Sequence, residues 1–339
     1  MNSARFQAIT AKYPQLRVAL VGDFCLDRYL EIDPARQEIS IETGLPVHNV
    51  VRVRSQPGAA GTILNNLVAL GLGEIYPVGF CGEDGEGFEL RRALEAKAGV
   101  RLEHFFQSRE RRTFTYCKPL VMQPGQAPRE LNRLDSKNWT PTPAALEDQL
   151  IAAVRKLADR VDAIILMDQV DHAETGVVTA RLLEAIRGVA EARPGLFIIA
   201  DSRRSLKAFP PVCFKMNAAE LAALTGIPGP LTFEEIQLQA AQLARKLRRH
   251  VFITLSERGI LGAAPDGEVE HLPVLPVRGE IDIVGAGDAV TANLGAAMSA
   301  GATLREAITL ANAAASIVVH QLGTTGTASV AQMAELLGL

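Results

Sequence analysis

Two carboxylates, Asp282 and Asp288, lie on either side of a turn of small residues in the stretch "EIDIVGAGDAV". In a structural interpretation the glycines make a tight turn and Asp288 caps the helix that follows. In a chemical interpretation, the N–H groups of Gly285, Ala286 and Gly287 approach a phosphoryl group and stabilise its developing charge. Asp288 then takes a proton from an attacking hydroxyl, and Asp282 interacts with a magnesium ion or its water shell. The local pattern leaves both interpretations open.

Two further glycine-rich stretches, "SQPGAAGTILNN" and "VGFCGEDGEG", lie earlier in the chain. Any one such stretch is more often a turn than a ligand loop. The phosphate-loop pattern GxxxxGK[ST] is absent, and no glycine cluster gives G-x-G-x-x-G directly after the first predicted strand. A dinucleotide-binding fold, and with it a dehydrogenase, is therefore disfavoured.

Four short apolar runs could position these groups: "RVALVGD" ending at Asp23, "DAIILMD" ending at Asp168, "LFIIAD" ending at Asp201, and "HVFITLSE". Continuous apolar runs are typical of strands covered on both faces, as in parallel sheets. Each run stops at polar or acidic residues. Because ligands bind beyond the carboxyl ends of parallel strands, several carboxylates should gather along one edge.

Segments with helical periodicity separate these runs, including "AALEDQLIAAVRKLADR" and "TGVVTARLLEAIRGVAEA". Two other helices open with residues in capping-box register, Thr232 with Glu235 and Thr303 with Glu306. The alternation of strands and helices predicts a doubly wound α/β fold. Residues 28–55 and 111–135 are interrupted by Pro and Gly and partly alternate, which favours a small β element outside the main sheet. We expect a single domain over residues 1–339.

Composition limits the classes of function. With a net charge of −3, the chain has no excess of positive charge that would indicate binding to nucleic acid or an anionic membrane. No apolar run approaches the ~20 residues that span a bilayer, and the first residues lack the apolar core of a signal peptide. We therefore expect a cytoplasmic protein. The four cysteines are widely spaced and the six histidines are scattered, so we expect neither a disulfide framework nor a zinc site.

Six stretches, in order along the chain, resemble motifs of the ribokinase-like sugar kinases, the PfkB family. They are "GDFCLDRY", "PGAAGTILNNLVALG", "VGFCGEDGEG", "KMNAAELAALTG", "ITLSERG" and "DIVGAGDAV". "SIETGLPVHNV" and "ANAAASIVVHQLGT" are similar to stretches of the heptose-phosphate kinases of lipopolysaccharide precursor synthesis. The resemblance implies a three-layer α/β/α fold with a mainly parallel sheet and a small β-strand lid. No second, nucleotidyl-transferring domain is expected after it.

The resemblance also implies roles for particular residues. Asp288 is the expected catalytic base, and Gly285, Ala286 and Gly287 the anion hole. The acceptor is expected to contact residues from the first half of the chain and the middle strands: Asp27, Gly58, Ala59, Thr62, Asn66, Asp168 and Arg203. The nucleotide is expected near Asn217, Glu220, Ser256, Gly259 and Asn312, with Asp282 and Glu220 facing magnesium. Asn217 also suits a plain helix cap, and Asn312 a packed polar residue.

This chain departs from the family pattern at several positions. Ala59 stands where a second glycine is usual, and Thr62 where an asparagine contacts the sugar. Ile283 and Val284 replace frequent hydroxyl residues. Two basic clusters, "DSRRSLKAF" and "RERRTF", suit phosphate recognition or ordinary surface charge. We have no role for His172 in "DQVDH".

The sequence thus favours an ATP-dependent, magnesium-assisted kinase that phosphorylates a hydroxyl of a sugar or sugar phosphate, with a heptose phosphate as one candidate. A homodimer through the lid is what the family and an exposed sheet edge suggest. Two alternatives stay open. One is a nucleoside kinase on the same fold, and the other is a non-catalytic sugar or nucleotide sensor, motivated by Ala59 and Thr62.

Overall fold

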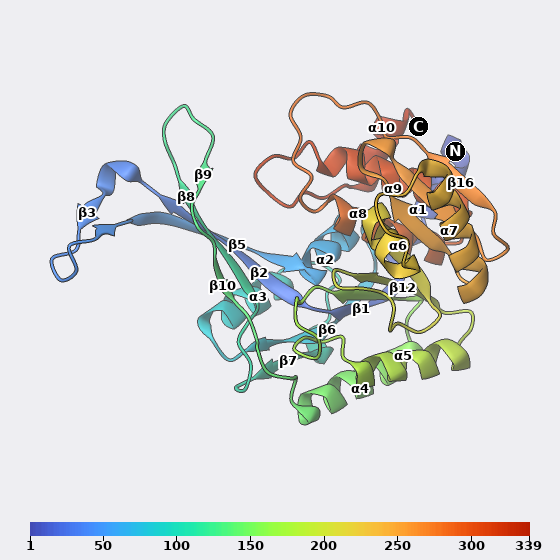
Figure 1. Cartoon of the computed structure of the whole chain (residues 1–339), viewed down its shortest axis with the longest axis horizontal. Coiled ribbons are helices and arrows are strands. Elements are labelled where there is room, and N and C mark those ends of the chain that lie inside the picture. Colours follow the sequence, from blue (N-terminus) through green and yellow to red (C-terminus); the bar gives the residue numbers. More distant parts are fainter.

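A nine-stranded sheet forms the centre of the protein in the computed structural model, which describes residues 1–339 (Figure 1). The strand order is β16-β15-β14-β13-β12-β11-β1-β6-β7. Strands from β7 to β14 pair in parallel, and β15 and β16 are antiparallel additions at one edge. The strands are β1 (Arg17–Gly22), β6 (Glu74–Gly82), β7 (Phe105–Ser108), β11 (Ala163–Asp168), β12 (Phe197–Ser202), β13 (Cys213–Asn217), β14 (Val251–Thr254), β15 (Ile260–Ala263) and β16 (Val269–Leu272).

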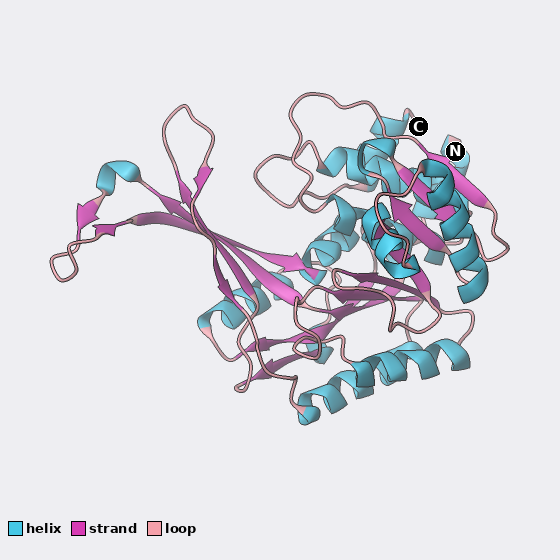
Figure 2. Cartoon of the chain, in the orientation of Figure 1, coloured by secondary structure: helices cyan, strands magenta, loops and turns pink.

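Helices cover both faces of this sheet (Figure 2). Alternate residues of β1 explain why: Val18 and Leu20 join one buried cluster, whereas Ala19 and Val21 join the other. The first cluster includes side chains of α1 (Ser3–Thr10), α2 (Ala60–Ala69), α3 (Gly85–Glu95), α8 (Ala286–Ser299), α9 (Leu304–Val318) and α10 (Val330–Leu337). The second includes α4 (Ala144–Ala158), α5 (Ala180–Ala192), α6 (Ala218–Thr225) and α7 (Phe233–Leu247). The sequence of a strand buried on both faces is a continuous apolar run.

A second, five-stranded sheet projects from this body, and we call it the arm (Figure 1). Its order is β10-β8-β2-β5, with β9 paired to β8, and a small hairpin, β3–β4, lies at its far end. The strands are β2 (Phe24–Ile32), β3 (Glu38–Ile39), β4 (Pro46–Val47), β5 (Val50–Ala59), β8 (Thr115–Val121), β9 (Arg129–Glu130) and β10 (Leu134–Ser136). Only Asp23 separates β2 from β1. The arm is therefore attached directly to the carboxyl end of a central strand.

The predicted fold class is confirmed: helices cover both faces of a mainly parallel sheet, with a small extra sheet beside it. The four predicted strands are β1, β11, β12 and β14. Both predicted capping boxes are present, at the starts of α7 and α9. Helix α5 starts later than its apolar pattern, at Ala180, because Thr179 caps it. Strands β6 and β13 were not predicted.

The cysteines form no disulfide, and three of the four are buried. No helix combines the length and hydrophobicity needed to cross a membrane.

Candidate active site

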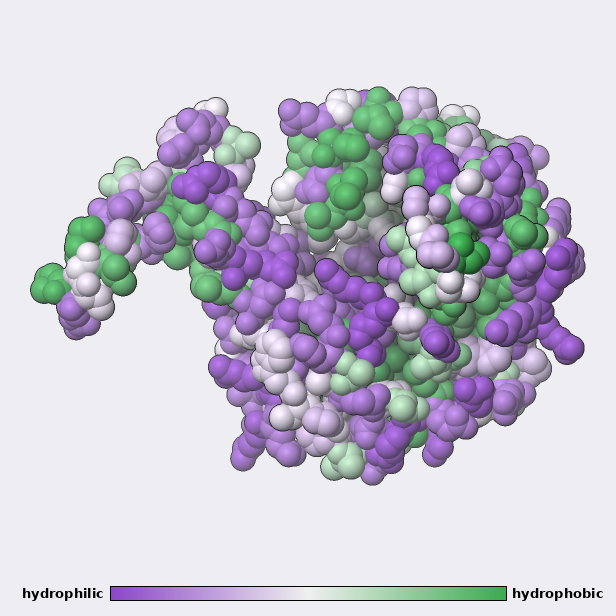
Figure 3. Space-filling view, in the orientation of Figure 1, coloured by the Kyte–Doolittle hydropathy of each residue, from purple (hydrophilic) through white to green (hydrophobic).

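The carboxyl ends of β1, β11, β12, β13 and β14 lie along one edge of the parallel sheet, as parallel strands require. The root of the arm reaches the same edge because β2 follows the carboxyl end of β1, and the first turns of α8 reach it because Thr291 bonds Asp201 of β12. Figure 3 shows the surface hollowed between the arm and the body. The candidate site is this cleft.

The Gly-Ala-Gly turn forms the start of α8. Gly285 is the N-cap residue, with φ of 83°, and no side chain caps this helix. The N–H of Ala286 donates to Ile283 O at 3.2 Å, whereas the N–H groups of Gly287 and Asp288 have no acceptor within the protein. Unpaired N–H groups at a helix start attract anions. Gly285, Gly287 and Asp288 thus have free N–H groups, whereas Ala286 uses its own within the turn and contributes its small size.

The two carboxylates that flank the turn differ in role. Asp282 Oδ1 accepts the N–H of Val284 at 3.0 Å, and the backbone N–H of Asp282 donates to Val319 O at 2.7 Å. Asp282 therefore holds the loop before the turn. Asp288 is the third residue of α8 and accepts no hydrogen bond from the protein. The interpretation of Asp288 as the helix cap is wrong, because Gly285 occupies that position.

The surroundings of Asp288 favour a carboxyl group that titrates near neutral pH. Burial raises the pKa of Asp288 to about 7, helped by the negative charges of Asp201 and Asp27 and opposed by Lys215. The side chain is nevertheless half-buried rather than enclosed. A carboxylate with a raised pKa, solvent access and no hydrogen-bond partner has the properties of a general base.

A buried ion pair lies under the start of α8. Lys215 of β13 and Asp201 of β12 are paired in the parallel register, and Lys215 Nζ lies 2.8 Å from Asp201 Oδ2. The same carboxylate oxygen accepts the hydroxyl of Thr291, one turn into α8, at 3.0 Å. The sheet and α8 are thereby joined through Asp201. Neither Lys215 nor Asp201 was among the predicted site residues.

Asp27 lies at the root of the arm, on β2, and is buried. Burial raises the pKa of Asp27, and Lys118 of β8, 3.5 Å from Asp27 Oδ1, opposes that rise. A Cβ atom on Gly58 would lie only 2.4 Å from Asp27 Oδ2, so glycine is required there. Ala59 follows with φ of 53° and ψ of −117°, a conformation that favours glycine. The departure from glycine at Ala59 therefore keeps the glycine backbone geometry.

Thr62 and Asn66 lie on α2 and are fully buried. The methyl group of Thr62 lies 3.5 Å from where a Cβ of Gly285 would be, so Thr62 packs behind the turn. Asn66 Nδ2 donates to Thr62 O at 3.0 Å and to Gly326 O at 3.4 Å. These contacts hold α2 against the loop before α10.

The residues expected near the nucleotide lie at several element ends. Asn217 and Glu220 form a complete capping box at the start of α6: Asn217 Oδ1 accepts the N–H of Glu220 at 2.9 Å, and Glu220 Oε2 accepts that of Asn217 at 2.7 Å. Ser256 is exposed after β14, and Gly259 has φ of 90° with no space for a Cβ beside Leu272 O.

Asn312 is buried on α9, and its Nδ2 donates to Pro273 O at 2.8 Å. This bond ties α9 to the segment after β16. The packed-residue interpretation of Asn312 accounts for this contact.

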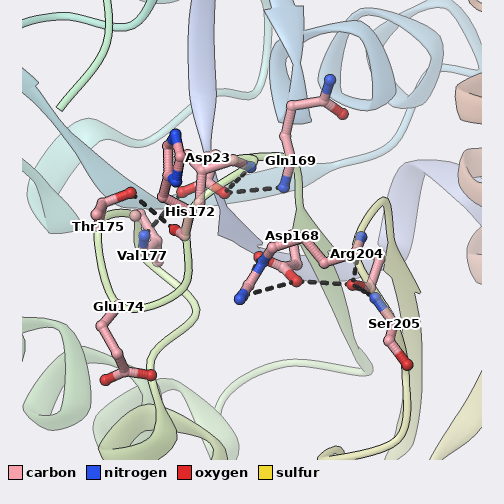
Figure 4. Close-up of polar contacts among 12 residues, drawn as sticks. Asp23, Asp168, Gln169, His172, Glu174, Thr175, Val177, Arg204 and Ser205 are labelled. Atoms are coloured by element: carbon pink, nitrogen blue, oxygen red, sulfur yellow. Dashed lines mark hydrogen bonds and ion pairs between the residues drawn. The ribbon is translucent and has the colours of Figure 1, made fainter. Parts of the chain in front are cut away.

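Asp168 is buried at the end of β11 and is already paired (Figure 4). It accepts the Ser202 hydroxyl at 2.6 Å and Arg204 Nη2 at 3.0 Å. Arg111, from the other basic cluster, is buried and donates to Thr175 O at 2.8 Å. Arg204 and Arg111 therefore stabilise loops, whereas Arg203 is exposed and its guanidinium has no partner in the protein.

Asp23 was predicted only as a strand end, but it organises the loop 169–177 beside the cleft (Figure 4). Its carboxylate accepts the N–H groups of Gln169 at 2.9 Å, Val170 at 3.2 Å and Val177 at 2.7 Å. Complete burial raises the pKa of Asp23 to about 6, and these N–H groups oppose the rise. In the same loop the ring of His172 packs against that of Trp139, tilted by 51° and with ring centroids 4.8 Å apart.

Solved structures with the same architecture define the fold. The chain is similar to a ribokinase of Arabidopsis thaliana in complex with ribose and ATP, with a TM-score of 0.68 and 20% identity over 96% of this chain and 99% of that one. It is also similar to phosphofructokinase-2 of Escherichia coli, with a TM-score of 0.72 and 18% identity over 95% of this chain and 98% of that one. The fold is ribokinase-like.

Sequence relatives define the family. Residues 18–331 match the pfkB family of carbohydrate kinases, and the chain belongs to this family. Its members are phosphotransferases with a hydroxyl acceptor. The chain is 31% identical over 99% of its length to the bifunctional protein HldE of Syntrophotalea carbinolica, and 32% identical over 91% to that of Azorhizobium caulinodans. It spans 66% and 61% of the lengths of these two relatives.

Proposed function

We propose that this protein transfers the γ-phosphoryl group of ATP to a hydroxyl of a sugar or sugar phosphate, with Asp288 as general base. One observation carries this proposal. Asp288 is a half-buried carboxylate with a pKa raised to about 7 and no hydrogen-bond partner, in the first turn of a helix whose start has free N–H groups. Base and anion site are thus built on the same turn.

The reaction would be an in-line displacement. Asp288 accepts the proton of the acceptor hydroxyl as its oxygen attacks the γ-phosphorus, and the bond from that phosphorus to the β–γ bridging oxygen breaks to release ADP. The unpaired N–H groups of Gly287 and Asp288 would stabilise the charge that develops on the transferred group. The helix dipole of α8 acts in the same direction.

The acidic side chains near the cleft fit a shared magnesium ion better than an all-protein metal cage. No group of three or more His, Cys, Asp or Glu side chains is arranged to hold a metal. Glu220 and Asp282 each use one carboxylate oxygen in a backbone contact, which leaves the other for an ion or its water. Magnesium is usually held by one or two carboxylates together with substrate phosphates. When bound, it would neutralise phosphate charge.

For the acceptor, we propose that Asp27 binds sugar hydroxyls. Its position is fixed by Gly58 and by Lys118, and its negative charge raises the pKa of Asp288, so the two carboxylates are close enough to interact. Arg203, exposed and unpaired after β12, supports an acceptor that already carries a phosphate. The resemblance of residues 40–50 to heptose-phosphate kinases places heptose phosphates first among the candidates.

The arm supports two further proposals. It adjoins the cleft through β2 and would close over the acceptor as a lid, which excludes water. It also exposes apolar side chains that suit a second copy of this chain: Ile39, Ile41, Leu45, Val50, Val51, Val53 and Leu134. A homodimer through the arm predicts that Val51→Asp combined with Val53→Asp halves the mass measured by light scattering.

The function is tested by measuring ADP release from ATP and magnesium with a panel of hexoses, heptoses, their phosphates and nucleosides. We expect turnover on a sugar or sugar phosphate. Turnover confined to nucleosides would instead identify a nucleoside kinase. Binding of ATP and a sugar without any ADP release would identify a sensor and refute the proposal.

A further inference from the structure

Lys215 is a buried cation whose nearest charged neighbours are carboxylates. It lies in β13, is almost fully buried, and has the side chains of Asp201, Asp288 and Glu220 around it. The only hydrogen bond that its ammonium group makes in the protein is the 2.8 Å contact with Asp201. Since an ammonium group has three N–H donors, two are left unused in a buried position.

The unused donors are close to the turn that we propose as the anion site. A Cβ atom on Gly287 would lie 3.1 Å from Lys215 Nζ, so the ammonium group lies directly against the first turn of α8. The N–H of Gly287 itself has no acceptor in the protein. A backbone donor and a cationic donor thus flank the same small space.

Neutralising Asp201 does not by itself explain why a lysine is here. A buried ion pair is often less stabilising than apolar residues of similar volume. Without Lys215, the nearby charged side chains would be Asp201, Asp288 and Glu220, and all three would repel a phosphoryl group. A cation is what this group of carboxylates needs to accept an anion.

We infer that Lys215 is a further catalytic residue, which contacts the transferred phosphoryl group and completes the anion site together with the N–H groups of Gly287 and Asp288. This inference rests on the proposed function. Lys215 donates to an oxygen of the γ-phosphoryl group while its bond to Asp201 fixes its position. It takes no part in proton transfer, which belongs to Asp288.

The test compares ATP with ADP, because only ATP carries the γ-phosphoryl group. Dissociation constants for both nucleotides, with magnesium, are measured by calorimetry for the wild type and for Lys215→Met. We expect ATP affinity to fall about 10- to 100-fold, the range for losing a hydrogen bond to a charged group, and ADP affinity to change little. The turnover number should fall about 100-fold or more, as when one oxyanion donor is removed. Lys246→Met, an exposed lysine on α7, is the matched control.

A second variant separates contact with phosphate from simple charge balance. Lys215→Met leaves Asp201 buried without its partner, so Lys215→Met is also combined with Asp201→Asn, and circular dichroism checks that each variant folds. If Lys215 contacts the phosphoryl group, the double variant still binds ATP more weakly than Asp201→Asn does, while its affinity for ADP changes little. If the double variant matches Asp201→Asn in ATP affinity and turnover, Lys215 only neutralises Asp201 and the inference is wrong. A wild type that binds no ATP would overturn both the inference and the proposed function, whereas ATP binding unaffected by Lys215→Met would overturn the inference alone.

Discussion

Replacing Asp288 with asparagine should stabilise the folded protein above neutral pH. The folded-state pKa of Asp288, about 7, is higher than its ordinary value of 3.8. The folded protein therefore binds this proton more tightly than the unfolded chain does. The stability linked to the proton is complete below pH 3.8 and is lost as the pH rises through 7. Asparagine has no proton to lose, so the variant escapes this loss.

The size of the effect follows from the same pKa. A rise from 3.8 to about 7 corresponds to about 4 kcal/mol of unfolding free energy. Because the Asp288 side chain is half-buried, water reaches it, and we reduce the expected effect to about 2 kcal/mol. This is a large part of the stability of a typical domain, about 5–15 kcal/mol.

Urea unfolding followed by circular dichroism at pH 4 and pH 8 measures the effect. The quantity of interest is the unfolding free energy of Asp288→Asn minus that of the wild type. Groups that do not interact with Asp288 titrate alike in both proteins, so a change in this difference reports on Asp288 and the charges coupled to it. We expect the difference to increase by about 2 kcal/mol between the two pH values. A difference that stays constant would refute the reasoning, because Asp288 would then have the same pKa in the folded and unfolded states.

Three other variants test separate parts of the site. Turnover of the wild type should rise with pH around a midpoint near 7. Asp201→Asn should lower this midpoint, because it removes a negative charge that raises the pKa of Asp288. An unchanged or higher midpoint would argue against the coupling of Asp201 and Asp288. Ala59→Gly should raise the unfolding free energy by about 1 kcal/mol, because φ of 53° and ψ of −117° disfavour a Cβ atom; destabilisation in urea unfolding would contradict this. Asp23→Asn should lower the unfolding free energy by about 3 kcal/mol and speed amide exchange at residues 169–177, because asparagine replaces an oxygen that accepts N–H groups. Unchanged exchange would show that the loop does not depend on Asp23.

The parts of the fold predicted from sequence are those where local pattern and burial agree. β1, β11, β12 and β14 are apolar runs because both faces of the sheet are covered. β13 was missed because it is short and contains Lys215, whose burial depends on an aspartate from the neighbouring strand. β6 was missed because it contains Pro77. The N–H of Ile75, two residues earlier, points away from β1 to Gly99 O, and β7 pairs with β6 only from Gly79 on, so the N–H that Pro77 lacks would have had no strand to pair with.

The candidate site was predicted unevenly for the same physical reason. The small residues and the acid of the turn before α8 are contiguous, so their pattern is visible in one stretch of sequence. Asp23, Asp201 and Lys215 act through partners far away in the chain, and only the strand order brings them together. A lysine inside the apolar stretch "CFKMN" was the one available signal for Lys215. Arg204 and Arg111 show the converse, because sequence alone does not reveal that their charges are used internally.

The central claim is that the second carboxylate of "DIVGAGD", and not the first, accepts the proton of the acceptor hydroxyl. The most direct measurement is the turnover number of Asp288→Asn beside that of Asp282→Asn, with the best acceptor, saturating ATP and magnesium. We predict that Asp288→Asn loses at least about 100-fold, the lower end for a general base. Asp282→Asn keeps an oxygen for the loop contact and leaves Glu220 as the other carboxylate for magnesium, so it should lose much less. Comparable turnover in Asp288→Asn and the wild type would contradict the account.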